Sequence, residues 1–119
     1  KHLDEKNVRR REIVSIYRKN LAQDCILPEN KDGKSVYHQI VLKHEKRDEI
    51  RKELTDNEIG SAIYYETPIH QQPIYQEPYR FELPNSEKFS KLILSLPSYP
   101  QLTNDQALEI CECVNKVIG

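Results

Sequence analysis

The stretch VYHQIVLK, residues 36–43, decides the fold class of this chain. Its residues alternate so that one face carries Val36, His38, Ile40 and Leu42, and this period of two is typical of a β-strand. Because His38 lies on the more apolar face, we expect it in the core or at an interface. A strand needs partners, and the surrounding sequence supplies candidates.

Two further stretches predict strands. IGSAIYYE, residues 59–66, is followed by Pro68, which limits its ladder, and LILSLP, residues 92–97, ends at Pro97. Helical patterns lie around these strands at residues 4–21, 45–58, 85–92 and 103–118. The sequence therefore predicts an α+β domain, with a small antiparallel sheet of about three strands, helices packed against it, and a long N-terminal helix in front.

The last predicted helix has the clearest features. Thr103 and Gln106 form a capping-box pattern at its start. Its apolar stripe contains Ala107, Ile110, Cys111, Val114, Val117 and Ile118. Cys113 lies about 200° around the helix from Cys111, so we expect Cys111 in the core, Cys113 at the surface and no shared metal ion.

Composition limits the class of protein. The 119 residues have the size of one domain, with 37% hydrophobic and 31% charged residues. A formal net charge of -1, from 18 basic and 19 acidic residues, argues against nucleic acid or an anionic membrane as a partner. Three cysteines give no disulfide framework, and the apolar runs are too short to span a bilayer, so we expect a cytoplasmic protein.

The beginning of the chain carries a separate expectation. The sequence contains no methionine and starts with KHLDEKN. Since translation starts with methionine, which is normally retained before a residue as large as lysine, we expect a segment upstream of Lys1 in the natural polypeptide.

The stretch YYETPIHQQPIY, residues 64–75, is the candidate functional segment. If the strand continues, Tyr64 and Tyr65 point to opposite faces, and His70 follows a proline-stiffened backbone that suits a ligand contact. Packing against a neighbouring domain or subunit explains the rings equally well. Around them, residues 67–84 hold four of the seven prolines and predict an irregular surface excursion. No motif for a catalytic nucleophile is present.

Three ordered segments resemble one known family. They are SVYHQIVLKHEKRDEIRKEL (35–54), EIGSAIYYETPIHQQPIY (58–75) and LILSLPSYPQLTNDQALEI (92–110). They resemble the C-terminal part of the DegT/StrS sugar-nucleotide aminotransferases, which use pyridoxal phosphate and have the fold-type I architecture. KNVRRREIVSIYRKNL, residues 6–21, is similar to the family helix that leads into this region.

The resemblance implies a role for each part of the chain. Residues 1–22 would be the connecting helix and residues 23–119 the C-terminal small domain, which lacks the large domain with the Schiff-base lysine. Tyr64, Tyr65 and His70 would contact the substrate, although Tyr64 stands where histidine is common. A phenol of pKa ~10 does not titrate near neutrality as an imidazole does, which weakens any proton-transfer role at Tyr64.

The resemblance also implies an activity for the parent polypeptide. It would move an amino group from an amino acid, usually glutamate, to a keto-sugar nucleotide, with the polypeptide usually a homodimer, and this chain alone would be inactive. A different hypothesis is a free-standing α+β module that binds a partner protein through residues 64–79.

Overall fold

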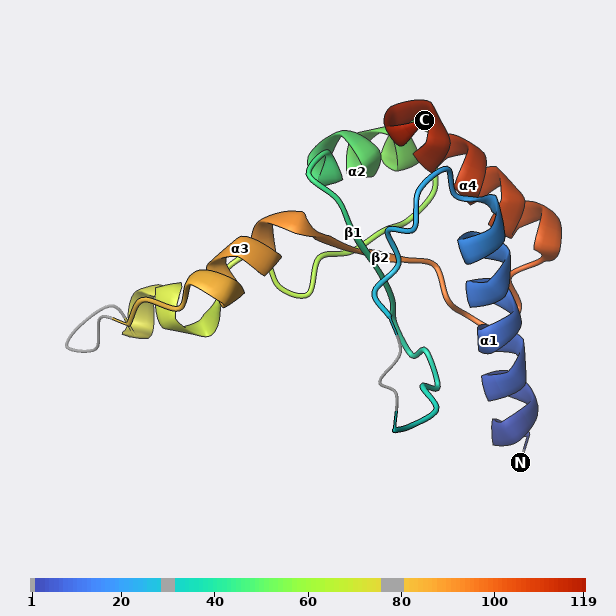
Figure 1. Cartoon of the computed structure of the whole chain (residues 1–119), viewed down its shortest axis with the longest axis horizontal. Coiled ribbons are helices and arrows are strands. Elements are labelled where there is room, and N and C mark those ends of the chain that lie inside the picture. The colour runs from blue at the N-terminus through green and yellow to red at the C-terminus, as the bar shows by residue number, and fades with distance from the viewer. Residues whose placement is uncertain (1, 29–31, 76–80) are drawn as a thin grey trace.

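The computed structural model describes residues 2–28, 32–75 and 81–119. The elements in chain order are α1 (Leu3–Asn20), β1 (Ile40–Lys43), α2 (Arg47–Asp56), the 3-10 turns η1 (Ile69–Gln71) and η2 (Pro73–Tyr75), α3 (Pro84–Leu92), β2 (Ile93–Leu96) and α4 (Asn104–Ile118). They form two regions (Figure 1). One region, the arm, consists of the described residues from 64 to 92 and extends away from the rest, which we call the body.

The sheet consists of β1 and β2, which pair antiparallel with Ile40 opposite Leu96 and Leu42 opposite Leu94. These four side chains are buried, so one face of the ladder lies on the core. The predicted α+β class is confirmed, but the predicted number of about three strands is wrong for the described residues. In the stretch 59–66, only Ala62 joins the ladder, through a bridge to Ser95, because the chain then leaves the sheet for the arm.

The prediction that residues 36–43 form one strand is correct only for its second half. The strand begins at Ile40, and the residues before it have irregular backbone. His38 is exposed, so the expected core position is wrong, whereas the alternative position at an interface stays a prediction. The alternation placed His38 on the buried face, but a residue outside the ladder is not held to that face.

The core lies where α1 and α4 pack together beside the sheet (Figure 1). α1 contributes Ile13, Val14 and Tyr17, all buried. The Tyr17 hydroxyl donates a hydrogen bond to the carbonyl oxygen of Pro97 at 2.9 Å, which ties α1 to the end of β2. Burial is the main cause of the raised pKa of this phenol. Among the described helices, none is both long and apolar enough to cross a membrane.

The capping box predicted at the start of α4 is confirmed. The Thr103 side chain accepts a hydrogen bond from the Gln106 amide at 3.2 Å, and Gln106 Oε1 accepts one from the Thr103 amide at 3.0 Å. Cys111 is buried as predicted, and burial raises the pKa of its thiol to about 11. Cys113 is also buried, so its predicted surface position is wrong.

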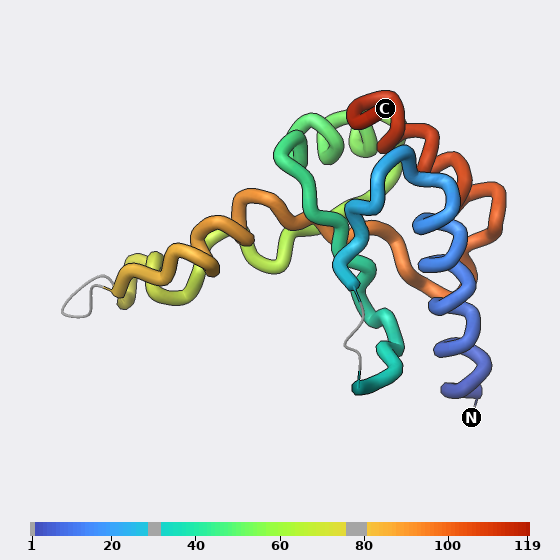
Figure 2. Tube along the Cα trace, viewed as in Figure 1, coloured from blue at the N-terminus to red at the C-terminus, as the bar shows by residue number. Residues whose placement is uncertain are grey.

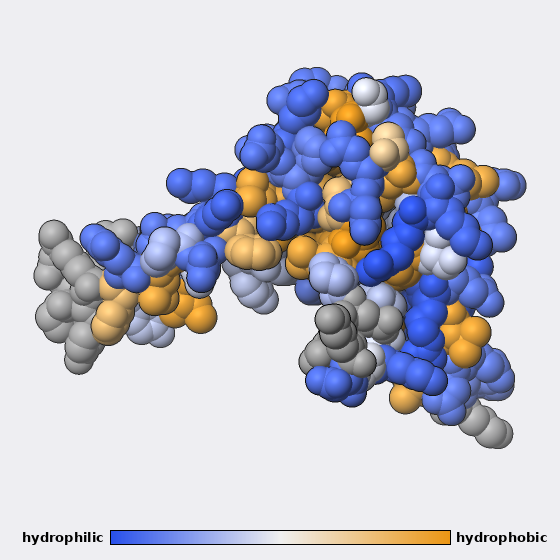
Figure 3. All heavy atoms as spheres, viewed as in Figure 1, coloured by the Kyte–Doolittle hydropathy of each residue, from blue (hydrophilic) through white to orange (hydrophobic). Residues whose placement is uncertain are grey.

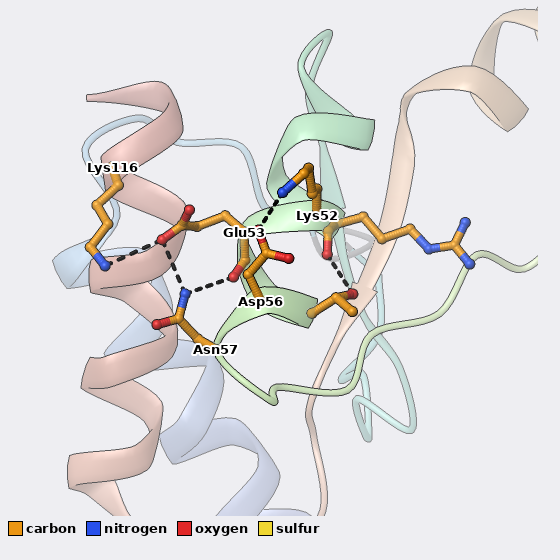
Figure 4. Close-up of polar contacts among 7 residues, drawn as sticks. Lys52, Glu53, Asp56, Asn57 and Lys116 are labelled. Atoms are coloured by element: carbon orange, nitrogen blue, oxygen red, sulfur yellow. Dashed lines mark hydrogen bonds and ion pairs between the residues drawn. The ribbon is translucent and has the colours of Figure 1, made fainter.

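The second buried side of α4 is explained by α2, which packs on it (Figure 4). Glu53 Oε1 accepts hydrogen bonds from Lys116 Nζ at 3.2 Å and from Asn57 Nδ2 at 3.1 Å. On the same helix Lys52 forms an ion pair with Asp56. α4 therefore lies between α1 and α2, and residues on two of its faces are removed from water.

The arm runs out from the body and back again (Figure 2). Residues 64–75 with η1 and η2 form the outward run, and α3, which begins at Pro84, forms the return. Pro84 occupies the first turn, where a missing amide hydrogen costs nothing. The predicted surface excursion is this outer part of the arm, and residues 76–80 of it lie outside the described residues.

The base of the arm is fixed to the body by Arg47 at the start of α2. Arg47 is buried, and its Nη1 donates hydrogen bonds to the carbonyl oxygens of Ser90 and Ile93, each at 3.1 Å. These carbonyls lie at the C-terminal end of α3, where a cation also interacts favourably with the helix dipole. Arg47 thus links the start of α2 to the junction between α3 and β2.

Candidate functional site: an aromatic pocket on the arm

Residues of the two runs of the arm line an open pocket of about 510 Å³, which we call the aromatic pocket. Its ring-bearing residues are Tyr64, Tyr65, His70, Tyr75, Phe81 and Phe89. The three residues predicted as the site, Tyr64, Tyr65 and His70, all line this one pocket. The structure thus brings together side chains that the sequence only placed near one another.

Tyr64 and Tyr65 form one wall of the pocket. Their rings meet edge to face, with centroids 5.6 Å apart and planes at 80°, and a cis peptide bond joins the two residues. The expectation that these rings point to opposite faces depended on a strand that continues through them, and this condition is not met, because only Ala62 of the stretch pairs with the sheet. Both rings are exposed, so both are available to a ligand.

His70 lies in the short turn η1, which follows Pro68. Its imidazole Nε2 lies 2.9 Å from Glu87 Oε1 on α3, and only 7% of its side chain is exposed. The same carboxylate oxygen accepts a hydrogen bond from the Leu83 amide at 3.1 Å. The bond from His70, followed by that from Leu83, holds the pKa of Glu87 below its ordinary value.

The sequence reasoning missed the α3 side of the pocket. Phe81 and Leu83 precede the helix and Phe89 lies within it, and all three side chains are exposed. Lys43 Nζ of β1 lies over the Phe89 ring, 4.7 Å from its centroid, a cation–π contact that helps to fix this ring. The available signal was the pair of large apolar residues, Phe81 and Leu83, directly before the helix-starting Pro84.

Exposed apolar side chains gather on the arm (Figure 3). They belong to Tyr64, Tyr65, Ile69, Ile74, Tyr75, Phe81, Leu83 and Phe89. An apolar concentration of this kind on a charged protein is typical of a surface that contacts a ligand or another part of a protein.

The chemistry of the aromatic pocket favours an uncharged ligand group. Among the described residues that line it, none is lysine, arginine, aspartate or glutamate. Its polar atoms are the hydroxyls of tyrosine, serine and threonine and the imidazole of His70. Flat rings and hydroxyl-bearing groups match such a surface, whereas a phosphate would require cations from elsewhere.

Pyridoxal phosphate does not fit this pocket as described. A Schiff base requires a lysine amine, and the cofactor phosphate requires several donors or cations. The described lining residues include no lysine and no arginine, so the Schiff base has no amine here and the phosphate would meet only hydroxyl groups and one imidazole. The aromatic pocket is therefore a candidate for binding and orienting a substrate.

Comparison with known proteins identifies the family. The model of the DegT/DnrJ/EryC1/StrS aminotransferase family matches residues 1–115. The chain is 34% identical over 115 residues to a GDP-perosamine synthase from Escherichia coli O157:H7, covering 91% of this chain and 30% of that protein. It is also 34% identical over 120 residues to a dTDP-3-amino-3,4,6-trideoxy-alpha-D-glucose transaminase from Streptomyces venezuelae, covering 97% of this chain and 32% of that protein.

Solved structures show the same fold. The crystal structure of S. venezuelae DesV in complex with a ketimine intermediate matches with a TM-score of 0.88 and 32% identity, covering 97% of this chain and 32% of that one. A DegT DnrJ EryC1 StrS aminotransferase from Brucella abortus matches with a TM-score of 0.85 and 31% identity, covering 99% and 32%. This chain thus spans about a third of the length of its relatives. The resemblance predicted from the sequence is confirmed, and the chain belongs to the DegT/DnrJ/EryC1/StrS aminotransferase family.

Proposed function

We propose that this chain is the C-terminal small domain of a pyridoxal-phosphate-dependent aminotransferase that transfers an amino group to a keto-sugar nucleotide. In this proposal residues 1–22 are the connecting helix and residues 23–119 are the small domain. The observation that carries the proposal is the family match over residues 1–115 in a chain that spans about a third of its relatives. Two of those relatives are named for nucleotide-linked sugars.

The role proposed for this chain is to bind and orient the substrate through the aromatic pocket. The rings of Tyr64 and Tyr65 stack against the sugar or the base, and His70 contributes a hydrogen bond. Because no described lining residue is a cation, the diphosphate is neutralised by residues outside the pocket. The chain thus contributes orientation and closure, which lower the entropic part of the barrier.

The chemical step belongs to another part of the parent polypeptide in this proposal. That part supplies the Schiff-base lysine and the site for pyridoxal phosphate, and the proposed amino donor is glutamate. The parent is proposed to be a cytoplasmic homodimer, and this chain alone to be inactive. These statements rest on the family resemblance together with the absence of lysine from the described pocket lining.

The test uses the complete polypeptide that carries this chain, loaded with pyridoxal phosphate. Amination of dTDP-, UDP- and GDP-linked keto-sugars with glutamate as donor would be followed by chromatography. We expect turnover of at least one of them, and a fall in kcat/KM of about tenfold or more for Tyr64→Ala, since stacking on an aromatic side chain contributes roughly 1–3 kcal/mol.

The matched control is Tyr99→Ala. Tyr99 is as exposed as Tyr64, at 48% against 46%, but it does not line the aromatic pocket. We expect this variant to keep the turnover of the unmodified protein. The proposed function is wrong if no keto-sugar nucleotide is aminated, and the proposed site is wrong if the two variants behave alike.

The alternative of a protein-interaction module also has an observation in its favour. Ile69 and Ile74 are strongly exposed on the arm, as expected for a surface that binds another protein. Of the segment 64–79 assigned to this role, residues 76–79 lie outside the described residues. In this case Tyr64→Ala would leave amination unchanged and weaken binding of the partner protein.

A further inference from the structure

Among the described residues that line the aromatic pocket, His70 is the only histidine, and its surroundings determine what it can offer a ligand. The ring is almost fully enclosed, with 7% of the side chain exposed, and Nε2 lies 2.9 Å from Glu87 Oε1. A carboxylate can only accept a hydrogen bond, so Nε2 must carry the proton. In the neutral ring this leaves Nδ1 unprotonated and able to accept a hydrogen bond.

Glu87 is itself held in place by the backbone. Its Oε1 accepts a hydrogen bond from the Leu83 amide at 3.1 Å, and its own amide donates to the Leu83 carbonyl oxygen at 3.0 Å. The carboxylate satisfies the amide of the residue before α3, and the second bond is the ordinary i→i−4 bond of the first helical turn. One carboxylate oxygen therefore joins the start of α3 to η1, the two sides of the pocket.

We propose that Glu87 is a positioning residue that fixes the orientation and tautomer of His70, so that Nδ1 is the nitrogen presented to a hydroxyl of the substrate. This inference rests on the proposed function for the identity of the substrate. The family match assigns no role to Glu87. In this inference Glu87 affects substrate binding through His70 and does not contact the reacting atoms. The depressed pKa of Glu87 agrees with a carboxylate that stays ionised at neutral pH.

The first test is spectroscopic and needs no substrate. In the complete polypeptide with 15N-labelled histidine, the signals of His70 are assigned by their loss in His70→Asn. We expect a proton on Nε2 in the unmodified protein and a mixture of tautomers in Glu87→Ala. Glu87→Gln keeps an oxygen acceptor at the same position and should largely restore the Nε2–H form.

The matched control is Glu82→Ala. This variant also removes a carboxylate from the arm, but Glu82 does not line the aromatic pocket. We expect its His70 signals to match those of the unmodified protein. An Nδ1–H tautomer in the unmodified protein, or the same signals in Glu87→Ala as in Glu82→Ala, would overturn the inference.

The second test is kinetic and separates this inference from the proposed function. We expect Glu87→Ala to raise KM for the keto-sugar nucleotide about tenfold, the effect of losing roughly one hydrogen bond, with a smaller change in kcat. Glu87→Gln should recover most of this loss. If His70→Asn leaves KM unchanged, the substrate role of His70 is wrong, whereas the tautomer result still decides whether Glu87 positions the ring.

Discussion

Ile50 in the body has no exposed surface, whereas Ile69 in the arm keeps 75% of its surface exposed. Ile50 lies on the buried face of α2, which packs against α4. Ile69 lies in a short 3-10 turn beside the aromatic pocket, together with several other exposed apolar residues. The same kind of side chain therefore stabilises the fold in one region and forms an accessible surface in the other.

This difference indicates that the body and the arm have different roles. The body contains its own hydrophobic core, since helices α1, α2 and α4 and the sheet bury one another's apolar faces. The arm has little core of its own, and its shape depends on local bonds such as those of Glu87 and Arg47. Substitutions should consequently affect stability in the body and binding in the arm.

The largest expected difference is between Ile50→Ala and Ile74→Ala. The first substitution leaves a cavity in the core and should lower the free energy of unfolding by about 2–5 kcal/mol. The second removes a side chain that is 79% exposed, and the change should stay within about 0.5 kcal/mol. Urea denaturation of the two variants measures both values, and similar losses would show that the arm is packed as tightly as the body.

Arg47→Met, at the base of the arm, should lower the free energy of unfolding by less than Ile50→Ala does. Two carbonyl oxygens, those of Ser90 and Ile93, would lose their donor, and we expect a loss of about 1–3 kcal/mol. Hydrogen exchange of the amides of α3 should accelerate as well. Arg51→Met is the control, because Arg51 forms an exposed ion pair with Glu66 that contributes about 0–1 kcal/mol. Equal effects of the two substitutions would contradict a special role for Arg47.

The capping box of α4 should contribute less to the free energy of unfolding than the hydrogen bonds of Arg47 do. Thr103→Ala removes the side-chain acceptor of the Gln106 amide, and the expected loss of unfolding free energy is about 1 kcal/mol. Thermal denaturation measures it. Thr103→Ser, which keeps the hydroxyl, should retain most of the stability, and a serine variant as unstable as the alanine variant would exclude the cap as the cause.

The smallest effect concerns pH and is confined to the arm. The pKa of Glu87 is depressed below 4.5, so its bonds stabilise the arm above that pH, and this contribution is lost as the pH falls through the depressed value. Hydrogen exchange of the Leu83 amide at decreasing pH, corrected for its intrinsic rate, should show increased opening. Glu87→Gln should remove this dependence, whereas Glu82→Gln should retain it.

The sequence predicted the features that depend on local chemistry. The capping box at Thr103 requires only residues within one helical turn, and the boundaries of α1, α2 and α4 follow from apolar periodicity and from helix-forming residues. The candidate site residues follow from the concentration of rings and prolines in residues 64–75 together with the family resemblance, and their role in binding stays a prediction. Their common location in one pocket could not be read from spacing, because α3 forms its other side.

The errors concern features that depend on distant parts of the chain. Cys113 was placed at the surface because a helix is expected to bury one stripe, but α2 covers a second face of α4. Residues 59–66 have the composition of a strand, yet a strand also needs a partner edge along its length. Only Ala62 has one, because the next residues belong to the arm.

The bridge between Ala62 and Ser95 has a consequence for how this domain can vary. The two residues exchange hydrogen bonds of 3.2 and 2.7 Å, so the chain enters and leaves the arm at adjacent points of an antiparallel pair. A short turn can join such neighbours without moving the sheet. We therefore expect that the outer part of the arm can change in length or sequence with little effect on the pairing of β1 and β2.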